Sequence, residues 1–449
     1  MFKPKEKTST INNDRILNYT HYSELPLKLV GCWDWFPDAV DMEKIIANYV
    51  YLCLVIFVLI NVTAMLMVSL YSEWVDIMSS LDMLADSLPY VASVLVVAYF
   101  AVYRAELYEL NDFMNKNFKF HSARGLTNMT MLKSYKMAKS FAYTYTVCSL
   151  CSSTMYAVVP MIIHWWTRTP VQGWFFMDVS RSPFLEISFL RQILSQIFLG
   201  LALGQLGVFF ASNSILLCGQ LDLICCSARN ARFTALLQNG VKHASLVSQY
   251  HDILKDEEHN YIYNTSEMVD SIYHYDEKVT NEFSRIDFDI YSATHDAHTA
   301  AALTAVARQG QVAAAYKRRF ERFASPLLVL RVVQVTLYLC TLLYAASRKL
   351  DTMTVEYLLA VSLDIFIYCY YGNQIIIQAD RVSTAAYQSS WHTMGLKPRR
   401  LLLNILLANK RQMIVRAGGF LPMDLRTYVN IIKTSFSYYT LLVNVNEHK

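Results

Sequence analysis

The side chains whose types and spacing most clearly indicate a functional role lie near the end of the chain. Residues 424–445 have the length and composition of an apolar helix. Leu441, Asn444 and Val445 are spaced i, i+3 and i+4, so a helix places them on one stripe. A helix in a soluble core would hide a polar side chain such as that of Asn444, and a helix surrounded by lipid would lack one. The pattern therefore indicates a helix with protein or lipid on one side and water on the other. An ordinary packed terminal helix is the alternative.

Other spacings that often support chemistry are weak in this sequence. His295 and His298 form an HDAH segment, but no further ligand follows at metal-binding spacing, so a solvated helix face is expected. Cys148 and Cys151 have CxxC spacing without a second pair, which favours small packing residues. We find no nucleophile–base arrangement and no Gly-rich phosphate loop. The sequence therefore predicts no enzyme, no metal site and no cofactor.

Composition points to a membrane protein. Of the 449 residues, 54% are hydrophobic and only 17% are charged, against roughly 25% in soluble domains. Mean hydropathy is +0.24. The net charge of +4 is too small to indicate a nucleic-acid partner. The nine cysteines are odd in number and lie mostly in apolar runs, so no disulfide framework is expected.

The apolar runs predict an all-α, polytopic membrane protein with seven transmembrane helices. A helix needs about 20 mostly apolar residues to span a bilayer. Six runs meet this requirement on sight, and the seventh is more polar but contains no Pro or Gly in its interior. The expected spans are roughly 45–70, 86–103, 138–164, 186–218, 324–346, 353–377 and 424–445.

Lysine and arginine are divided unevenly between the connections of these spans. The N-terminal segment and the second, fourth and sixth connections contain 31 of them, and the other connections together with the C-terminal tail contain 5. The positive-inside bias therefore predicts a cytoplasmic N-terminus and an extracellular C-terminus. An Ala-rich stretch of strong helix formers before residue 324 is expected to extend the fifth span into the cytoplasm as one long helix.

About 80 residues from the sixth span onward carry a specific signature. In order, they contain Tyr371-Gly372-Asn373, Ala386-Tyr387, Trp391, Lys410-Arg411, Ala417-Gly418-Gly419 and the KTSFSY run that begins at Lys433. This order and spacing resemble the C-terminal signature of insect odorant receptors. Upstream, the resemblance extends only to the number, spacing and polarity of the spans, and residues 255–320 depart from the family pattern.

The resemblance implies an odorant-gated, non-selective cation channel in the cell membrane of an olfactory sensory neuron. Four subunits would surround one pore, and most family members combine with a shared co-receptor subunit as a heterotetramer. Four copies of the last helix would stack rings of Leu441, Asn444 and Val445, where apolar rings gate by dewetting and a neutral amide ring suits hydrated cations. A ligand-tuning subunit is expected, because the co-receptor should differ in its anchor and terminal sequence.

The same resemblance implies a cytoplasmic anchor that joins the subunits. A helix over roughly 380–411 is expected, followed by a break at Gly418-Gly419 and a new helix that starts at Pro422, with Asp424 near its positive end. Tyr387 and Trp391, at i and i+4, are expected on one face, where they pack against a neighbouring subunit or within their own. The expected anchor residues are Tyr371, Gly372, Asn373, Tyr387, Trp391, Lys410, Arg411, Gly418 and Gly419.

These expectations divide the chain into six parts. They are a cytoplasmic N-terminal segment (1–44), transmembrane helices one to four with the ligand-sensing part (45–218), a long cytoplasmic loop with helix extensions (219–323), helices five and six (324–377), the cytoplasmic anchor helix and Gly-Gly turn (378–423), and the pore-lining helix with a short tail (424–449).

A small volatile ligand needs an enclosed, mostly apolar cavity with few polar groups. The resemblance places it in the outer half of one subunit, among the second, third, fourth and sixth helices. Depth along these helices selects the candidates, and ordinary packing is the alternative for each. They are Val91, Leu95, Ser152, Tyr156, Val159, Ile193, Gln196, Ile197, Tyr357 and Val361.

Two charged residues stand out within the spans. Arg191 lies about a turn inside the fourth span and is expected to snorkel toward the interface. Asp364 lies near the middle of the sixth span, where a charge is costly. A structural partner for Asp364 is favoured over a role as counter-ion for a basic ligand.

Two other receptor classes are alternatives. A G-protein-coupled receptor has the opposite orientation, and its acidic-Arg-Tyr, CWxP and NPxxY motifs are absent from this sequence. The related gustatory receptor class shares the pore helix. The Tyr371-Gly372-Asn373 and Ala417-Gly418-Gly419 signatures favour the odorant branch.

Overall fold

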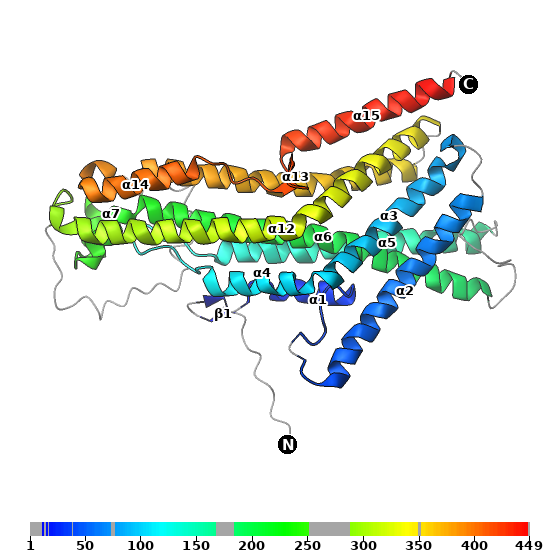
Figure 1. The fold of residues 1–449 in the computed structure, drawn as a ribbon, viewed down its shortest axis with the longest axis horizontal. Coiled ribbons are helices and arrows are strands. Elements are labelled where there is room, and N and C mark those ends of the chain that lie inside the picture. Colours follow the sequence, from blue (N-terminus) through cyan, green and yellow to red (C-terminus); the bar gives the residue numbers. More distant parts are fainter. Residues whose placement is uncertain are drawn as a thin grey trace.

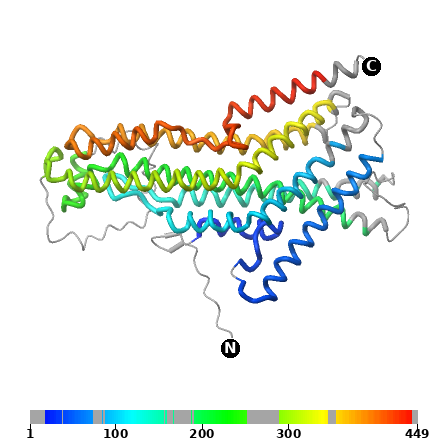
Figure 2. The backbone as a smooth tube through the Cα atoms, viewed as in Figure 1, coloured from blue at the N-terminus to red at the C-terminus, as the bar shows by residue number. Residues whose placement is uncertain are grey.

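The structure is a computed structural model that describes residues 11–12, 15–16, 18–37, 39–72, 77–167, 184–250, 288–348 and 352–447. Long helices form an elongated bundle, from one end of which α2, α3 and α15 diverge (Figures 1 and 2). These long helices are α2 (Met42–Ser72), α3 (Ile77–Val102), α5 (Leu132–Thr167), α6 (Phe184–Arg229), α12 (Asp296–Arg348), α13 (Thr352–Tyr387) and α15 (Leu425–Glu447).

Shorter elements cover and connect the bundle. The helices are α1 (His21–Leu29), α4 (Arg104–Asn117), α7 (Ala231–Gln238), α8 (His243–Gln249) and α14 (Leu396–Asn409), with the 3-10 turns η2 (Ala293–His295) and η3 (Trp391–Thr393). Two antiparallel pairs of two-residue strands complete the described chain, namely β1 (Ile11–Asn12) with β2 (Arg15–Ile16), and β3 (Arg416–Ala417) with β4 (Leu421–Pro422).

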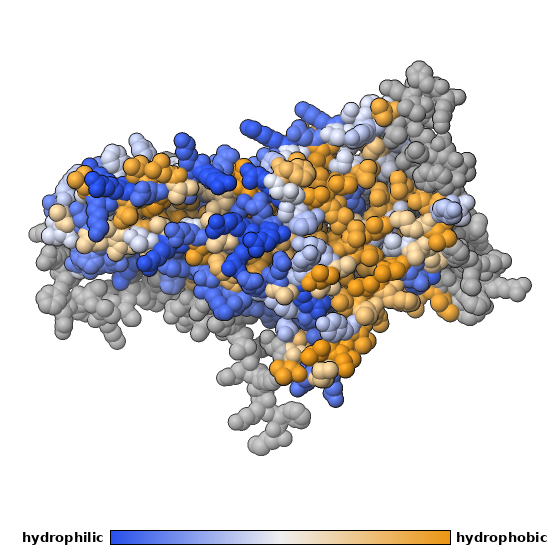
Figure 3. All heavy atoms as spheres, viewed as in Figure 1, coloured by the Kyte–Doolittle hydropathy of each residue, from blue (hydrophilic) through white to orange (hydrophobic). Residues whose placement is uncertain are grey.

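Each of the seven expected spans coincides with one of the long helices. Within the described residues, four helical segments are long and apolar enough to cross a membrane, and α3 with α4, bent by 67°, adds a fifth. Apolar side chains gather on the half of the surface that contains α2 and α3 (Figure 3). The chain is therefore an all-α, polytopic membrane protein, as predicted. The number of seven spans and the cytoplasmic N-terminus stay predictions.

The longest helices extend well beyond the apolar half. α6 has 46 residues and α12 has 53, so α12 alone is about 80 Å long at 1.5 Å per residue. The Ala-rich stretch continues unbroken into the fifth expected span. With α7 and α14, these extensions form a second half, here called the arm (residues 219–250, 288–323 and 378–411). Leu303, Val306, Tyr316 and Phe320 of α12 are buried in it, and they belong to the same core as the apolar half.

The expected continuous helix over 380–411 is wrong. α13 ends at Tyr387, and the Ser389 hydroxyl donates to the carbonyl of Ala386 at 2.7 Å, which satisfies an acceptor left free by the helix end. The turn η3 follows, and α14 starts only after Gly395. Pro398 lies in the first turn of α14, where its missing N–H is tolerated. The local turn chemistry of the Gln-Ser-Ser-Trp segment therefore ends the helix early.

The connection to α15 also differs from the prediction. Gly418 and Gly419 do not break a helix, since α14 has already ended at Asn409. They form the tip of the β3–β4 hairpin with φ of 61° and 78°, a backbone conformation that favours glycine. Pro422 lies in β4, not at a helix start. Asp424 caps α15, because its Oδ1 accepts the N–H of Thr427 at 2.8 Å.

Candidate functional site

A cavity of about 350 Å³ lies within the apolar half, lined by α3, α5, α6, α12 and α13 and partly open to the surface of the chain. This volume falls in the range of small-molecule sites. Its walls combine aliphatic and aromatic side chains with a few hydroxyl and amide groups. Of the ten predicted pocket residues, the structure brings four together around it, namely Ser152, Gln196, Tyr357 and Val361.

The other predicted pocket residues do not join this lining. Val91, Ile193 and Ile197 are half-buried elsewhere, and Leu95 is 47% exposed. The side chains of Tyr156 and Val159 lie outside the described residues. Depth along a helix selected all ten, but depth does not say which side of the helix meets the cavity.

A buried ion pair forms part of the cavity wall. The Nε of Arg331 on α12 lies 2.8 Å from the Oδ2 of Asp364 on α13. The hydroxyl of Tyr145 on α5 donates to the Oδ1 of Asp364 at 3.1 Å, and Arg331 also donates to the Oε1 of Gln334. Arg331 and Asp364 are 7% and 8% exposed. Three helices therefore meet at one charge-neutral polar cluster.

This cluster supplies the structural partner predicted for Asp364. Both of its carboxylate oxygens accept hydrogen bonds from protein, and the cation of Arg331 balances its charge. Sequence reasoning missed Arg331, although a lone arginine inside the expected span 324–346 was a usable signal.

Two further polar contacts connect neighbouring helices. The Oε1 of Gln196 on α6 accepts a hydrogen bond from the hydroxyl of Tyr90 on α3 at 2.6 Å, on the cavity wall. Arg191 donates from Nη1 to Asn61 on α2 at 3.2 Å. Arg191 therefore has a protein partner where snorkelling was expected.

Small residues bring α5 and α6 close together beside the cavity. Gly200 and Gly204 on α6 face Ser153 and Ser149 on α5, a small-xxx-small arrangement on both helices. A Cβ atom on Gly200 would lie 1.7 Å from the Oγ and 2.8 Å from the Cβ of Ser153. The Ser149 hydroxyl donates to the carbonyl of Gly200 at 2.8 Å, which such a close approach permits.

We expect Gly200→Ala to lower the free energy of unfolding by about 1–3 kcal/mol, because overpacking forces the two backbones apart. Gly207→Ala is the matched control, since its added Cβ would find its nearest contact 3.4 Å away on Tyr145. Both substitutions carry the same change in helix propensity. Thermal unfolding of the purified chain in detergent measures the difference, and Gly200→Ala with Ser153→Gly should recover part of the loss. Equal stability of the two alanine variants would refute the steric argument.

The last helix, α15, lies at the edge of the bundle against α12 and α13 (Figure 1). Ile431 and Ser435 are buried on its inner face, and the Tyr428 hydroxyl is 2.9 Å from that of Ser362 on α13. Leu441 lies on the outer face and is 59% exposed. The exposed positions below it on the same stripe are Asn430, Thr434 and Ser437. α15 includes Asn444 and Val445, but their side chains lie outside the described residues.

The Tyr371-Gly372-Asn373 segment joins α13 to its neighbours. The ring of Tyr371 packs edge-on against Phe141 on α5 with centroids 5.2 Å apart. A Cβ on Gly372 would lie 2.1 Å from the carbonyl oxygen of Met423, so only glycine allows the chain leading to α15 to lie directly on α13. Asn373 is half-buried in the same turn.

The remaining anchor residues lie at the surface of the arm. The rings of Tyr387 and Trp391 are 6.4 Å apart, but they belong to the end of α13 and to η3, so the predicted single helical face is wrong. Tyr387 is 67% exposed and Trp391 is 38% exposed, which leaves both free for contacts beyond this chain. Lys410 and Arg411 follow α14 directly and are exposed.

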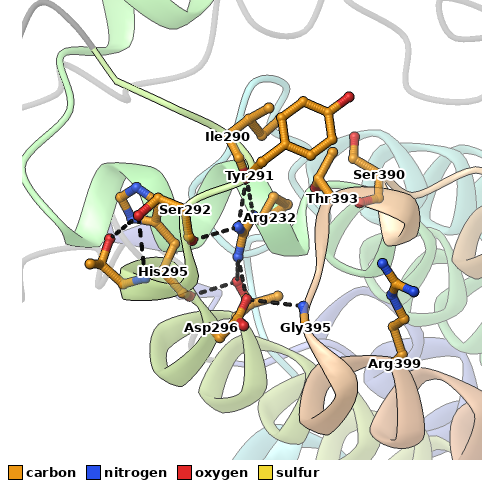
Figure 4. Close-up of polar contacts among 12 residues, drawn as sticks. Arg232, Ile290, Tyr291, Ser292, His295, Asp296, Ser390, Thr393, Gly395 and Arg399 are labelled. Carbon is orange, nitrogen blue, oxygen red and sulfur yellow. Dashed lines mark hydrogen bonds and ion pairs between the residues drawn. The ribbon is translucent and has the colours of Figure 1, made fainter.

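A buried arginine fastens the far end of the arm (Figure 4). Arg232 on α7 is fully buried and donates to the carbonyls of Ile290 and Ser292, at 2.6 to 3.0 Å. Its Nη1 lies 2.9 Å from the Oδ1 of Asp296, which also accepts the N–H of Gly395 at 3.2 Å. The guanidinium therefore joins α7, the start of α12 and the turn before α14.

Two minor predictions need correction. His295 is buried, not solvated, and its Nδ1 lies 2.6 Å from the amide nitrogen of Asn239, whereas His298 is exposed as expected. Cys148 and Cys151 are free, exposed thiols in the single chain, so they are not packing residues there. Cys148 lines the cavity.

Comparisons with known proteins agree on one family. The family model described as 7tm Odorant receptor matches residues 73–436. Odorant receptor 83a of Drosophila melanogaster is 23% identical over 86% of this chain and 85% of its own length, and Putative odorant receptor 85e of the same species is 22% identical over 91% and 87%. The solved structure of the insect olfactory receptor OR5 from Machilis hrabei in complex with eugenol superimposes with a TM-score of 0.69 at 16% identity, over 95% of this chain and 97% of that one. The chain therefore belongs to the insect odorant receptor family.

Proposed function

We propose that this chain is the ligand-tuning subunit of an odorant-gated, non-selective cation channel. It forms a heterotetramer with a shared co-receptor subunit in the cell membrane of olfactory sensory neurons. The cytoplasmic N-terminus, the extracellular C-terminus and the pore-lining role of α15 are parts of this proposal. Membership in the odorant receptor family supports the binding of an odorant.

The exposed polar stripe on α15 carries the pore proposal. Asn430, Thr434 and Ser437 repeat every three to four residues along a helix whose other face packs on α12 and α13. The Thr434 hydroxyl donates to the carbonyl of Asn430 at 2.8 Å. In a membrane, the side chains of Asn430 and Ser437 need water or protein partners, since lipid cannot satisfy their hydrogen bonds. Leu441 stands above them at a position where an apolar ring can close a pore by dewetting.

The cavity supplies a route from ligand to pore. Asp364 lies on its wall, and two residues before it on α13 Ser362 contacts Tyr428 of α15. The ring of Phe366, two residues after Asp364, packs edge-on against Tyr428 at 5.4 Å. A ligand that shifts α13 would therefore act on α15 directly, through one residue.

Exposed apolar side chains on the arm support assembly. Tyr387 and Trp391 are joined there by Leu396, Leu403 and Leu407 of α14, which are 74%, 55% and 60% exposed. Apolar groups gathered in this way mark protein–protein contacts more often than water-facing surface. A tetramer with α14 against its neighbours would cover them.

The first test is current in excised, nucleotide-free patches from cells that express the chain with and without a family co-receptor, under a broad panel of volatiles. Current within milliseconds, without GTP and only with the co-receptor, supports a tuning subunit of a heteromeric channel. Current from this chain alone would refute the heteromeric part of the proposal. A response that needs GTP, and that persists when the chain itself conducts no current, would refute the proposal that the chain forms part of a pore.

Two single cysteine substitutions test which face of α15 lines the pore. We expect Leu441→Cys to make the current sensitive to block by a charged thiol reagent, because the side chain meets the ion path. Phe436→Cys is the control, since Phe436 is 51% exposed on a different side of the same helix. The unsubstituted chain controls for its own exposed thiols. Equal block of both variants would contradict the assignment of the stripe.

A further inference from the structure

A second and larger cavity, of about 1200 Å³, lies between the arm and residues 412–416. It is bounded by α12, by α14 and by residues 410–416, and is here called the basic groove. Its wall contains five cationic side chains and one carboxylate, namely Lys317, Arg318, Lys410, Arg411, Arg416 and Glu321. It shares no residue with the 350 Å³ cavity of the apolar half or with the exposed stripe of α15.

The single carboxylate is already engaged by the protein. The Oε2 of Glu321 lies 2.6 Å from the Nζ of Lys317, and its Oε1 accepts the backbone N–H of Arg416 at 2.9 Å. Across the described part of the chain, the side chains of Arg318, Lys410, Arg411 and Arg416 form no ion pair. A concave wall with four uncompensated cations repels its own charges, so it favours a bound anion.

Amide side chains add neutral hydrogen-bond donors to this wall. Gln311 lies on α12, Asn404 and Asn409 lie on α14, and Gln412 follows it. Arginine forks and amides together suit phosphate oxygens, which accept several hydrogen bonds at once. A ligand with more than one phosphate matches four cations spread over a groove of this size better than a small monovalent anion does.

The groove runs along α12 from Leu303 to Glu321, and its Glu321 end lies where the arm meets the apolar half. Glu321 is one helical turn before Ser325, whose carbonyl accepts the N–H of Gly418 at 3.3 Å. The expected fifth span begins at residue 324, so the groove borders the predicted cytoplasmic face of the bilayer. In Figure 3 polar side chains extend up to the edge of the apolar surface. Basic pockets at this depth bind the head groups of anionic lipids.

We propose that the basic groove binds the phosphorylated inositol head group of a membrane phosphoinositide. Arg318, Lys410, Arg411 and Arg416 pair with its phosphates, and the amides of α14 accept or donate to its hydroxyls. A soluble inositol phosphate shares this chemistry, but the position beside the bilayer favours the lipid. Occupancy would tie α12 to residues 410–416, the segment that leads to α15.

The test uses the full-length chain in lipid nanodiscs of phosphatidylcholine with and without phosphatidylinositol 4,5-bisphosphate, with bound lipid counted by native mass spectrometry. The groove variant is Arg318→Gln/Lys410→Gln/Arg411→Gln. The matched control, Lys397→Gln/Arg400→Gln/Arg426→Gln, removes three exposed cations outside the lining. We expect roughly 100-fold weaker binding in the groove variant, from about 1 kcal/mol for each basic residue, and a near-unchanged affinity in the control.

Soluble inositol 1,4,5-trisphosphate is added as a competitor to identify the source of the phosphates. Weak competition supports a lipid-borne head group. Full displacement at equal concentration supports the groove as a phosphate site but overturns the membrane source. Equal loss of binding in the groove variant and the control, or no bound lipid in the unsubstituted chain, would overturn the site. All variants are compared at equal recovery of folded protein by size-exclusion chromatography.

Discussion

Replacing Asp364 by leucine is expected to destabilise the chain by about 3–5 kcal/mol, because it leaves the cation of Arg331 buried and unpaired. Arg331→Met should lower the stability by a similar amount, because it leaves the Asp364 carboxylate buried in the apolar half without a cation. In the double variant neither charge remains, and well-packed apolar residues can replace a buried pair with little loss. We therefore expect Arg331→Met/Asp364→Leu to recover most of the stability lost in each single variant.

Thermal unfolding in detergent and the amount of chain at the cell surface measure this cycle. Glu356→Leu, near the start of α13, is the control, since Glu356 is exposed and forms no ion pair in the described residues. A double variant that is no more stable than the single variants would mean that Arg331 and Asp364 contribute to stability beyond the mutual neutralisation of their charges. Comparison of odorant responses between the double variant and the original chain then separates a role in folding from a role in the cavity.

Arg232→Met is expected to loosen the far end of the arm, with a loss of about 3–5 kcal/mol in local stability. The substitution removes the donors for the carbonyls of Ile290 and Ser292 and leaves Asp296 without its cation. Buried carbonyls without a partner are costly. The stability of Arg232→Lys should lie between that of the original chain and that of Arg232→Met. A lysine ammonium keeps the charge but cannot reproduce the guanidinium fork that reaches several acceptors.

Backbone hydrogen exchange measures this effect. Faster exchange is expected over residues 231–238, 293–299 and 395–399, while α2 and α3 should keep their protection. Arg308→Met is the control, since Arg308 lies on the exposed face of α12 in the same arm. Uniformly faster exchange throughout the chain would show that the cluster supports the whole fold and not the arm alone.

Gly395 shows how narrow the sequence requirement of this cluster is. A Cβ there would lie 2.1 Å from the Oδ2 of Asp296, although nothing in its neighbourhood of the sequence announces such a contact. The two residues are 99 positions apart. Sequence spacing indicates contacts only between residues within a few helical turns of each other, so it could not predict this cluster.

The predicted pocket illustrates the same limit. Depth along a helix is readable from the ends of an apolar run, and it placed Ser152, Gln196, Tyr357 and Val361 at the level of the cavity. Rotation about the helix axis is set by packing, and in helices that are apolar on every side it leaves no periodic pattern. α6 has such a composition, so Ile193 and Ile197 could not be told from Gln196 before the helices were placed.

The sequence by itself determined the family, the positions of the long helices and the polar character of the last one. These follow from composition, from the length of apolar runs and from a local signature, which are all properties of neighbouring residues. Only the tertiary structure decided that Arg331 pairs with Asp364 and Tyr145, that the helix over 380–411 breaks before α14, and that a basic groove forms beside α12. Each of these depends on contacts between segments far apart in the chain, and the geometry of such contacts is fixed by how the helices pack.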